Sequence, residues 1–318
     1  MDFGRRRTEK YTFKSPKIKD LRELGDLVAD PIGFKDRYGI LMSLLKNNMT
    51  NGILATLVQF HGQLYHCFTF PDYQLMSTLE EYSYLLGLHI YDQIPFSGLE
   101  EIPKDKVISE ATHLKMSDIK AYMTTKGGIL GLPAKFMMDK ARYFASMKSI
   151  DAFKAILALL IYGLFLFYNV DINAIKIFLI GNTVPSLVAD TYHSVHLRNS
   201  YSGGMVIFYV PLLYKWLISH LPRSTAFWNL RDGLLWSQKI MSLTYSDIEW
   251  YSHAYDEVKI IENCGEFPNV PLLDTKRGIN YNPILAHRQL GYPMKDKPSN
   301  ILLEVLFFKE GEDNKSLK

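Results

Sequence analysis

The side chains best suited to binding a metal lie in one short segment, residues 190–196 (DTYHSVH). On a helix, positions i, i+3 and i+6 share a face, so Asp190, His193 and His196 would converge there. A zinc centre needs further ligands at matched spacing, and neither HExxH nor another zinc motif occurs in the chain. The sequence therefore predicts no metal site, and it names these three residues as the candidates for one.

Other nucleophiles and metal ligands match no known arrangement. His61 and His66 stand near Cys67, but their spacing fits no standard zinc signature. Cys67 and Cys264 lack a local cysteine-protease signature, and the chain has no GxSxG motif for a serine hydrolase. We therefore predict no catalytic residue.

Phosphate and cofactor motifs are missing as well. The clusters Gly127-Gly128 and Gly203-Gly204 fit neither GxGxxG nor GxxxxGK[ST]. Lys154, Lys176 and Lys215 lie in apolar helical patterns, where a lysine usually extends its amine to solvent. The sequence predicts no cofactor and no cofactor-binding residue.

Adjacent acids provide no further site. We interpret Glu80-Glu81 as charge at the start of a helix, and Glu100-Glu101 as part of a solvated loop. An enzyme with an unrecognised site stays open as an alternative, and it would gather titratable groups in a pocket, for instance around residues 190–196.

A basic arm covers residues 1–19. Its cationic residues are Arg5, Arg6, Arg7, Lys10, Lys14, Lys17 and Lys19. Such a segment is either a solvated terminus or a site for nuclear import or phosphate contact. Nucleic-acid binding through this arm is therefore a second alternative function.

Composition and charge indicate a folded globular chain. The 318 residues are 47% hydrophobic and 22% charged, and the formal charge of +3 is too small to require a nucleic-acid partner. The longest apolar run, residues 155–168, would reach only about 21 Å as a helix, against a hydrocarbon core of roughly 30 Å. We expect a buried core helix, no membrane association and no secretory signal peptide.

Hydrophobic periodicity predicts a mainly α-helical fold. The expected helices cover residues 20–28, 36–46, 53–60, 79–86, 117 to a stop at 124–128, 133–167 in two pieces, 171–179, 185–197, 206–221 and 282–291. A polar connection is expected over 95–106 and a short extended piece over 65–71. Either Ser77 with Glu80 or Thr78 with Glu81 has capping-box spacing, and Gly87 would end that helix. We predict one multi-helix globular domain over residues 20–308, with at most a few short strands and a polar tail over 309–318.

Three stretches resemble the plant mobile domain family. They are residues 70–88 (FPDYQLMSTLEEYSYLLGL), residues 248–251 (IEWY) and residues 285–293 (LAHRQLGYP). Ser77, His89 and Leu290 depart from the family pattern at helix ends and in packing. The chain is most similar to an uncharacterised plant-specific subgroup within or beside that family.

This resemblance implies what composition and motifs do not. Members of the family are transposon-associated, some act in nuclear silencing and genome maintenance, and others are fused to phosphatase-like domains. Because the helical pattern has well-formed caps and no catalytic motif is assembled, we predict a non-catalytic protein-interaction module. The resemblance adds a transposon-related origin, the nucleus (otherwise the cytoplasm) as its place, and a phosphatase-like protein as a candidate among its protein partners.

Overall fold

The computed structural model describes most of the chain between residues 11 and 281. The described ranges are 11–13, 18–46, 50–62, 67–88, 102–126, 128–166, 170–181, 183–200, 204–206, 210–229, 235–250, 270–273 and 278–281. The predicted helix over 282–291 and the polar tail lie outside them.

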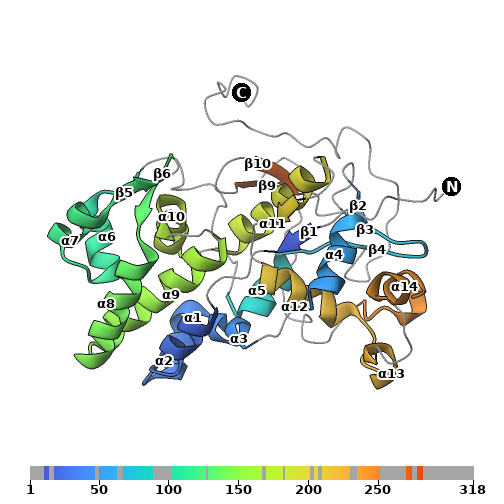
Figure 1. Ribbon diagram of the computed structural model, residues 1–318, viewed down its shortest axis with the longest axis horizontal. Helices are drawn as coiled ribbons and strands as arrows, with labels where there is room; N and C mark the ends of the chain where they lie inside the picture. Colours follow the sequence, from blue (N-terminus) through green and yellow to red (C-terminus); the bar gives the residue numbers. More distant parts are fainter. Residues whose placement is uncertain are drawn as a thin grey trace.

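The described residues form a mainly α-helical globular domain, as the sequence predicts (Figure 1). The helices are α1 (Ile18–Gly25), α2 (Pro31–Tyr38), α3 (Leu41–Leu45), α4 (Asn51–Gln59), α5 (Leu79–Leu86), α6 (Asp105–Thr112), α7 (Met116–Tyr122), α8 (Ala134–Ser146), α9 (Ile150–Leu166), α10 (Ile172–Ile180), α11 (Val184–Ser200), α12 (Val210–His220), α13 (Thr225–Trp228) and α14 (Trp236–Met241), with a 3₁₀ turn, η2, over Tyr245–Asp247.

The strands among the described residues are short. They are β1 (Tyr11–Phe13), β2 (His61–Gly62), β3 (Cys67–Thr69), β4 (Gln74–Leu75), β5 (Thr124–Lys126), β6 (Ile129–Leu132), β7 (Val170–Asp171), β8 (Gly204–Val206), β9 (Val270–Leu273) and β10 (Gly278–Tyr281). β2-β3-β4 and β5-β6-β7 are antiparallel sheets, β9 and β10 form an antiparallel pair, and β1 pairs with β8 in parallel. Strands of two to four residues cannot bury a core face of their own, so the helices carry the core.

The most buried helix is α9, which three residues separate from the end of α8. Every residue from 152 to 163 is buried, and α9 packs against α8, α10, α1 and α6. A helix that is apolar on all sides must be surrounded by other elements. The burial of α9 therefore confirms the sequence prediction of a core helix. Among the described residues, none of the helices combines the length and apolar character that a bilayer crossing needs.

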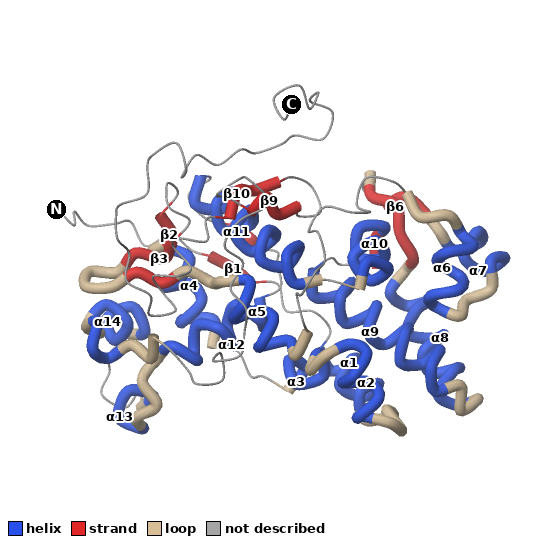
Figure 2. The backbone as a smooth tube through the Cα atoms, turned by 180° about the vertical axis from the view of Figure 1, so that it is seen from behind, coloured by secondary structure: helices blue, strands red, loops and turns tan. Residues whose placement is uncertain are grey.

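The α6–α8 group lies at one end of an elongated arrangement, and α13 and α14 lie at the other (Figures 1 and 2). Between them, α5, α11 and α12 pack together, with α5 in contact with both of the others. Segments far apart in the sequence therefore meet at α5.

The first two expected helices, over 20–28 and 36–46, differ from the structure. Pro31 starts α2 instead of ending α1, because Asp30 caps the helix by accepting a hydrogen bond from the Gly33 amide at 2.9 Å. Gly39, with φ of +70°, then separates α2 from α3, and a Cβ there would overlap the Leu86 carbonyl oxygen. The expected helix over 36–46 is thus two helices.

The helix expected to start near Val206 begins at Val210. Residues 204–206 instead form β8, whose backbone pairs with Tyr11–Phe13 of the predicted arm. The polar connection expected over 95–106 also ends earlier, because α6 begins at Asp105.

Candidate functional site

The predicted metal candidates lie on α11, which packs against α4, α5 and β9. Asp190 and His193 are buried, and His196 is partly buried. Within the described ranges, however, no group of three or more His, Cys, Asp or Glu side chains has the geometry to hold a metal ion. Asp190, His193 and His196 therefore form no such group.

The other residues that the sequence analysis considered take part in turns, strands and ion pairs of the fold. Gly128 forms the turn between β5 and β6 with φ of +80°, and Cys67 is buried in β3 as a free thiol. Lys19 is exposed in α1, and Lys154 is not solvated as expected, because its side chain is 8% exposed and its amine lies 2.6 Å from the Asp30 carboxylate. The remaining cations of the arm, Cys264 and Glu100-Glu101 lie outside the described residues.

The strongest convergence of polar side chains starts at the N-terminus of α5. Thr78 caps the helix: its hydroxyl accepts from the Glu81 amide at 3.1 Å, and its own amide donates to Glu81 Oε2 at 2.9 Å. The Thr78 hydroxyl also donates to Glu81 Oε2 at 2.9 Å. This is the capping box that the sequence offered as one of two alternatives, and Gly87 ends the helix in the left-handed conformation as predicted.

Glu81 is not a solvated helix-start charge, because the α5 N-terminus points into the core. Glu80 and Glu81 are both 0% exposed. A carboxylate in this position must find hydrogen-bond donors and a compensating charge within the protein.

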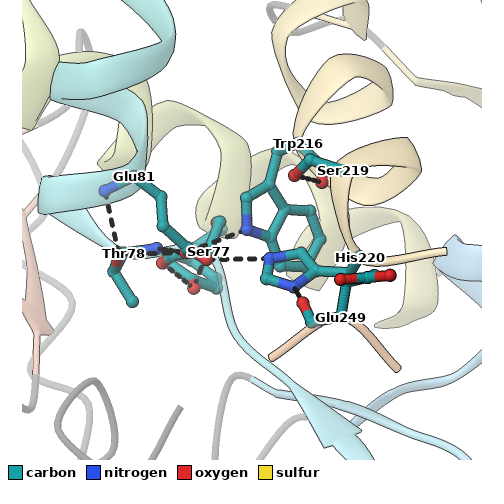
Figure 3. Close-up of polar contacts among 8 residues, drawn as sticks. Ser77, Thr78, Glu81, Trp216, Ser219, His220 and Glu249 are labelled. Atoms are coloured by element: carbon teal, nitrogen blue, oxygen red, sulfur yellow. Dashed lines mark hydrogen bonds and ion pairs between the residues drawn. The ribbon is translucent and has the colours of Figure 1, made fainter. Parts of the chain in front are cut away.

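The α12 helix supplies both of these partners (Figure 3). Trp216 and His220 are four residues apart and so project from one face of the helix. The Trp216 indole N–H donates to Glu81 Oε2 at 2.9 Å, and His220 Nε2 lies 2.8 Å from Glu81 Oε1. Their rings are 5.3 Å apart in an edge-to-face arrangement.

A third segment closes the cluster at the end of α12. His220 Nδ1 lies 2.8 Å from the Glu249 backbone carbonyl, while the Glu249 amide donates to the His220 carbonyl at 3.0 Å. Ile248 is buried beside this contact. The first two sequence stretches that carried the family resemblance thus meet through one histidine.

Both nitrogens of the His220 ring lie within hydrogen-bonding distance of oxygen atoms that can accept, and this arrangement favours the doubly protonated, cationic ring. Burial disfavours the charged form, but the charge and hydrogen bond of Glu81 and the Glu249 carbonyl together raise the pKa of His220 above its ordinary value of 6.5. Burial likewise raises the pKa of Glu81, but the His220 charge and the donated hydrogen bonds outweigh it and lower that pKa. The position of His220 at the last residue of α12 also favours a cation.

Tyrosines surround this ion pair and connect it to α11 and β10. The Tyr192 hydroxyl donates to the Ser77 carbonyl at 2.5 Å, and burial is the main reason that the pKa of Tyr192 lies well above its ordinary value. The Tyr281 hydroxyl accepts from the Leu79 amide at 3.4 Å and donates to Glu80 at 3.3 Å. Four chain segments are therefore held at the start of α5.

This geometry stabilises the fold and offers no route to a substrate. Both carboxylate oxygens of Glu81 have hydrogen-bond partners within the protein, and Glu81 and His220 are both buried. A general acid or base must reach the proton that it transfers, directly or through one water. The arrangement is thus a closed ion pair that joins α5, α12 and the segment at residue 249.

Sequence reasoning missed His220 and Trp216, and it interpreted Glu81 only as charge and a possible cap at the start of a helix. The available signal was the Trp-x-x-x-His spacing on an apolar helix, which puts two donors on one buried face. The corresponding signal for Glu81 was that the acid of its capping box is followed by a mostly apolar helix.

One comparison with known proteins returned a match. The model of a family described as a domain of unknown function (DUF7745) matches residues 21–318. No curated protein and no solved structure matches the chain.

Proposed function

The chain belongs to the DUF7745 family of domains of unknown function, and we propose that it is a non-catalytic protein-interaction module of transposon-related origin. Its place of action is the nucleus, in silencing or genome maintenance. The resemblance of residues 70–88 and 248–251 to the plant mobile domain family suggests the origin and the compartment.

The closed Glu81–His220 pair is the observation that carries the non-catalytic part. Both side chains of this ion pair are buried, and the protein supplies hydrogen-bond partners for both. Polar groups arranged in this way hold segments in register, whereas an active site leaves a donor, an acceptor or a charge for the substrate.

Exposed apolar side chains support the interaction part. Large exposed apolar residues among those described are Leu27, Ile32, Tyr84, Ile102, Val107, Met116, Tyr122, Tyr143, Met147, Ile150, Leu235, Met241 and Tyr245. Tyrosine and methionine are enriched at protein–protein interfaces, where a partner removes their exposed apolar surface from water. A phosphatase-like protein is the candidate partner that the family resemblance suggests.

The experiment is affinity capture of the full chain, tagged at its C-terminus, from plant nuclei. We expect a stable protein partner that survives nuclease treatment. Recovery of nucleic acid alone, or of no stable protein, would contradict the proposal.

Nucleic-acid binding through the basic arm is the second candidate, because β1 attaches part of the arm to β8. Its test is the variant in which Arg5, Arg6 and Arg7 are changed to alanine. If the arm binds nucleic acid, this variant loses affinity for DNA or RNA, and the wild-type affinity falls steeply with salt.

A further inference from the structure

One exposed surface combines aromatic, aliphatic and cationic side chains on neighbouring helices. We call it the α7–α8 stripe and define it by the exposed Tyr122 on α7 and the exposed Tyr143 and Met147 on α8 and its C-cap, together with the partly exposed Lys140 and the buried Phe136, on which Tyr122 stacks. The α8 positions are spaced by four, three and four residues, so they follow one face over about 16 Å.

The side chains of the stripe are ordered by contacts with one another. The Tyr122 and Phe136 rings stack at 4.1 Å, and the Lys140 amine lies 5.5 Å and 6.0 Å from the Phe136 and Tyr143 ring centroids. Yet Tyr122, Tyr143 and Met147 remain 47%, 54% and 62% exposed. The rings of Tyr122 and Tyr143 are therefore held by their neighbours and still face water, which lowers the entropy cost of binding a partner.

The charge around the stripe indicates the kind of partner. Residues 102–150 contain nine Lys and Arg against four Asp and Glu, which gives +5, so the rest of the chain carries −2 of the total of +3. Asp118 is paired with Lys140 at 2.6 Å and Asp139 with Arg142 at 3.7 Å. The exposed lysines in or directly beside these two helices that form no ion pair with another described residue are Lys115, Lys120, Lys135 and Lys148.

We propose that the α7–α8 stripe binds an acidic amphipathic helix of a partner protein. The apolar face of that helix would cover the exposed area of Tyr122, Tyr143 and Met147, and its flanking carboxylates would meet the unpaired lysines. This recognition mode needs apolar anchors at i, i+3 or i+4, and i+7, which matches the length of the stripe.

Charge and chemistry disfavour the other occupants. A second copy of the chain would bring two faces of the same positive charge together. A nucleic acid would place phosphates against Asp118 and Asp139 and would leave Met147 without an apolar contact.

The inference rests on the proposed function and names the partner class that this surface accepts. The test uses fluorescence anisotropy with the full chain and a labelled, capped 15-residue peptide that has Leu at positions 3, 6, 7, 10 and 14 and Glu and Ala elsewhere. Control probes are the same peptide with Lys in place of Glu, a scrambled peptide of equal composition, and a dT20 oligonucleotide.

We expect the acidic peptide to bind at least tenfold more tightly than each control probe. The double variant Tyr143→Ser with Met147→Ser and the charge reversal Lys135→Glu with Lys148→Glu should each weaken binding about tenfold or more. Leu235→Ser, at a position that is 67% exposed beside α14, is the matched control and should bind as the wild type does. Far-ultraviolet circular dichroism and thermal melts verify that each variant is folded.

Several outcomes would overturn the inference. They are failure of the acidic peptide to bind, equal affinity in the stripe variants, tighter binding of the lysine peptide or of dT20, and binding that depends on dimerisation of the chain in sedimentation. If affinity capture returns a protein partner that the stripe variants still bind, this inference fails while the proposed function stands. If capture returns no partner at all, the proposed function fails.

Discussion

Replacement of His220 by glutamine should destabilise the protein more than replacement of any exposed cation. Both N–H donors of the glutamine side chain introduced by His220→Gln sit on one nitrogen, so it can reach Glu81 or the Glu249 carbonyl but cannot span both as the ring does, and it carries no charge. Loss of one partner of a fully buried ion pair costs about 3–5 kcal/mol, because the other charge is left uncompensated. The lost hydrogen bond accounts for about 1 kcal/mol of that total.

That loss would be a large share of the free energy of unfolding, which is about 5–15 kcal/mol for a typical domain. The assay is equilibrium urea unfolding at pH 6, followed by tryptophan fluorescence and circular dichroism. The matched control is Lys106→Gln, which breaks an exposed pair with Glu110 at 3.8 Å and should leave the midpoint nearly unchanged.

A double-mutant cycle isolates the pair itself. In the cycle of His220→Gln and Glu81→Gln, the double variant should be more stable than the sum of the single losses predicts, because neither charge is then left alone. A loss below about 1 kcal/mol in His220→Gln, or additive effects in the cycle, would refute a structural ion pair at this position.

Three further results are expected. Folding raises the pKa of His220 above 6.5, so its stabilising contribution is present below pH 6.5 and is lost as pH rises through the folded-state pKa. Folding lowers the pKa of Glu81, so its contribution is present above pH 4.5 and is lost in acid. Wild-type urea midpoints should therefore fall as pH rises above about 6.5, and this fall should be absent in Glu81→Gln; an identical pH profile would contradict the assignment. Thr78→Ala should cost about 1–2 kcal/mol in urea unfolding and Thr78→Ser should restore most of it, whereas an unchanged midpoint in the alanine variant would mean that the capping box contributes nothing. Gly39→Ala should cost roughly 3 kcal/mol or prevent folding, and Gly128→Ala about 1 kcal/mol, because both have positive φ but only the first Cβ would overlap a backbone oxygen; equal melting temperatures would exclude that overlap.

Local signals predicted much of the fold. The capping box of Thr78 and Glu81, the left-handed stop at Gly87 and the continuous apolar pattern of α9 depend on residues close together in sequence. Such patterns determine where helices begin and end and which of them are buried. The helix near residue 31 was wrong because Pro31 was treated as a break, although proline also suits the first turn.

The candidate site depends on contacts that no local pattern encodes. Glu81 and His220 are 139 residues apart, and β1 finds its partner in β8 only when the chain has folded. A charged residue is usually exposed, so the sequence favours a surface position for Glu81 until His220 and Trp216 are seen to meet it. In the sequence, only the apolar residues around Glu81 indicate that its carboxylate is buried.

The α7–α8 stripe could be found only in part from the sequence. Its spacing along α8 is visible in the chain, but the same spacing is typical of a buried face. In the structure Met137, Met138 and Ala141 of α8 are buried, and so is Phe136 at the start of the stripe, whereas Tyr143 and Met147 are exposed. Which face a helix buries is set by its neighbours, here α9.

The protonation state of His220 tests the central claim most directly, because a histidine that serves a reaction must exchange its proton. The measurement is two-dimensional NMR of the full chain labelled with ¹⁵N at histidine, recorded between pH 5 and 8, with His220→Gln used to assign the resonances. We predict two protonated ring nitrogens for His220 that do not change through pH 7. Titration of this ring near pH 6.5 to a neutral form would show an imidazole available to solvent and would contradict the claim that the polar cluster is purely structural.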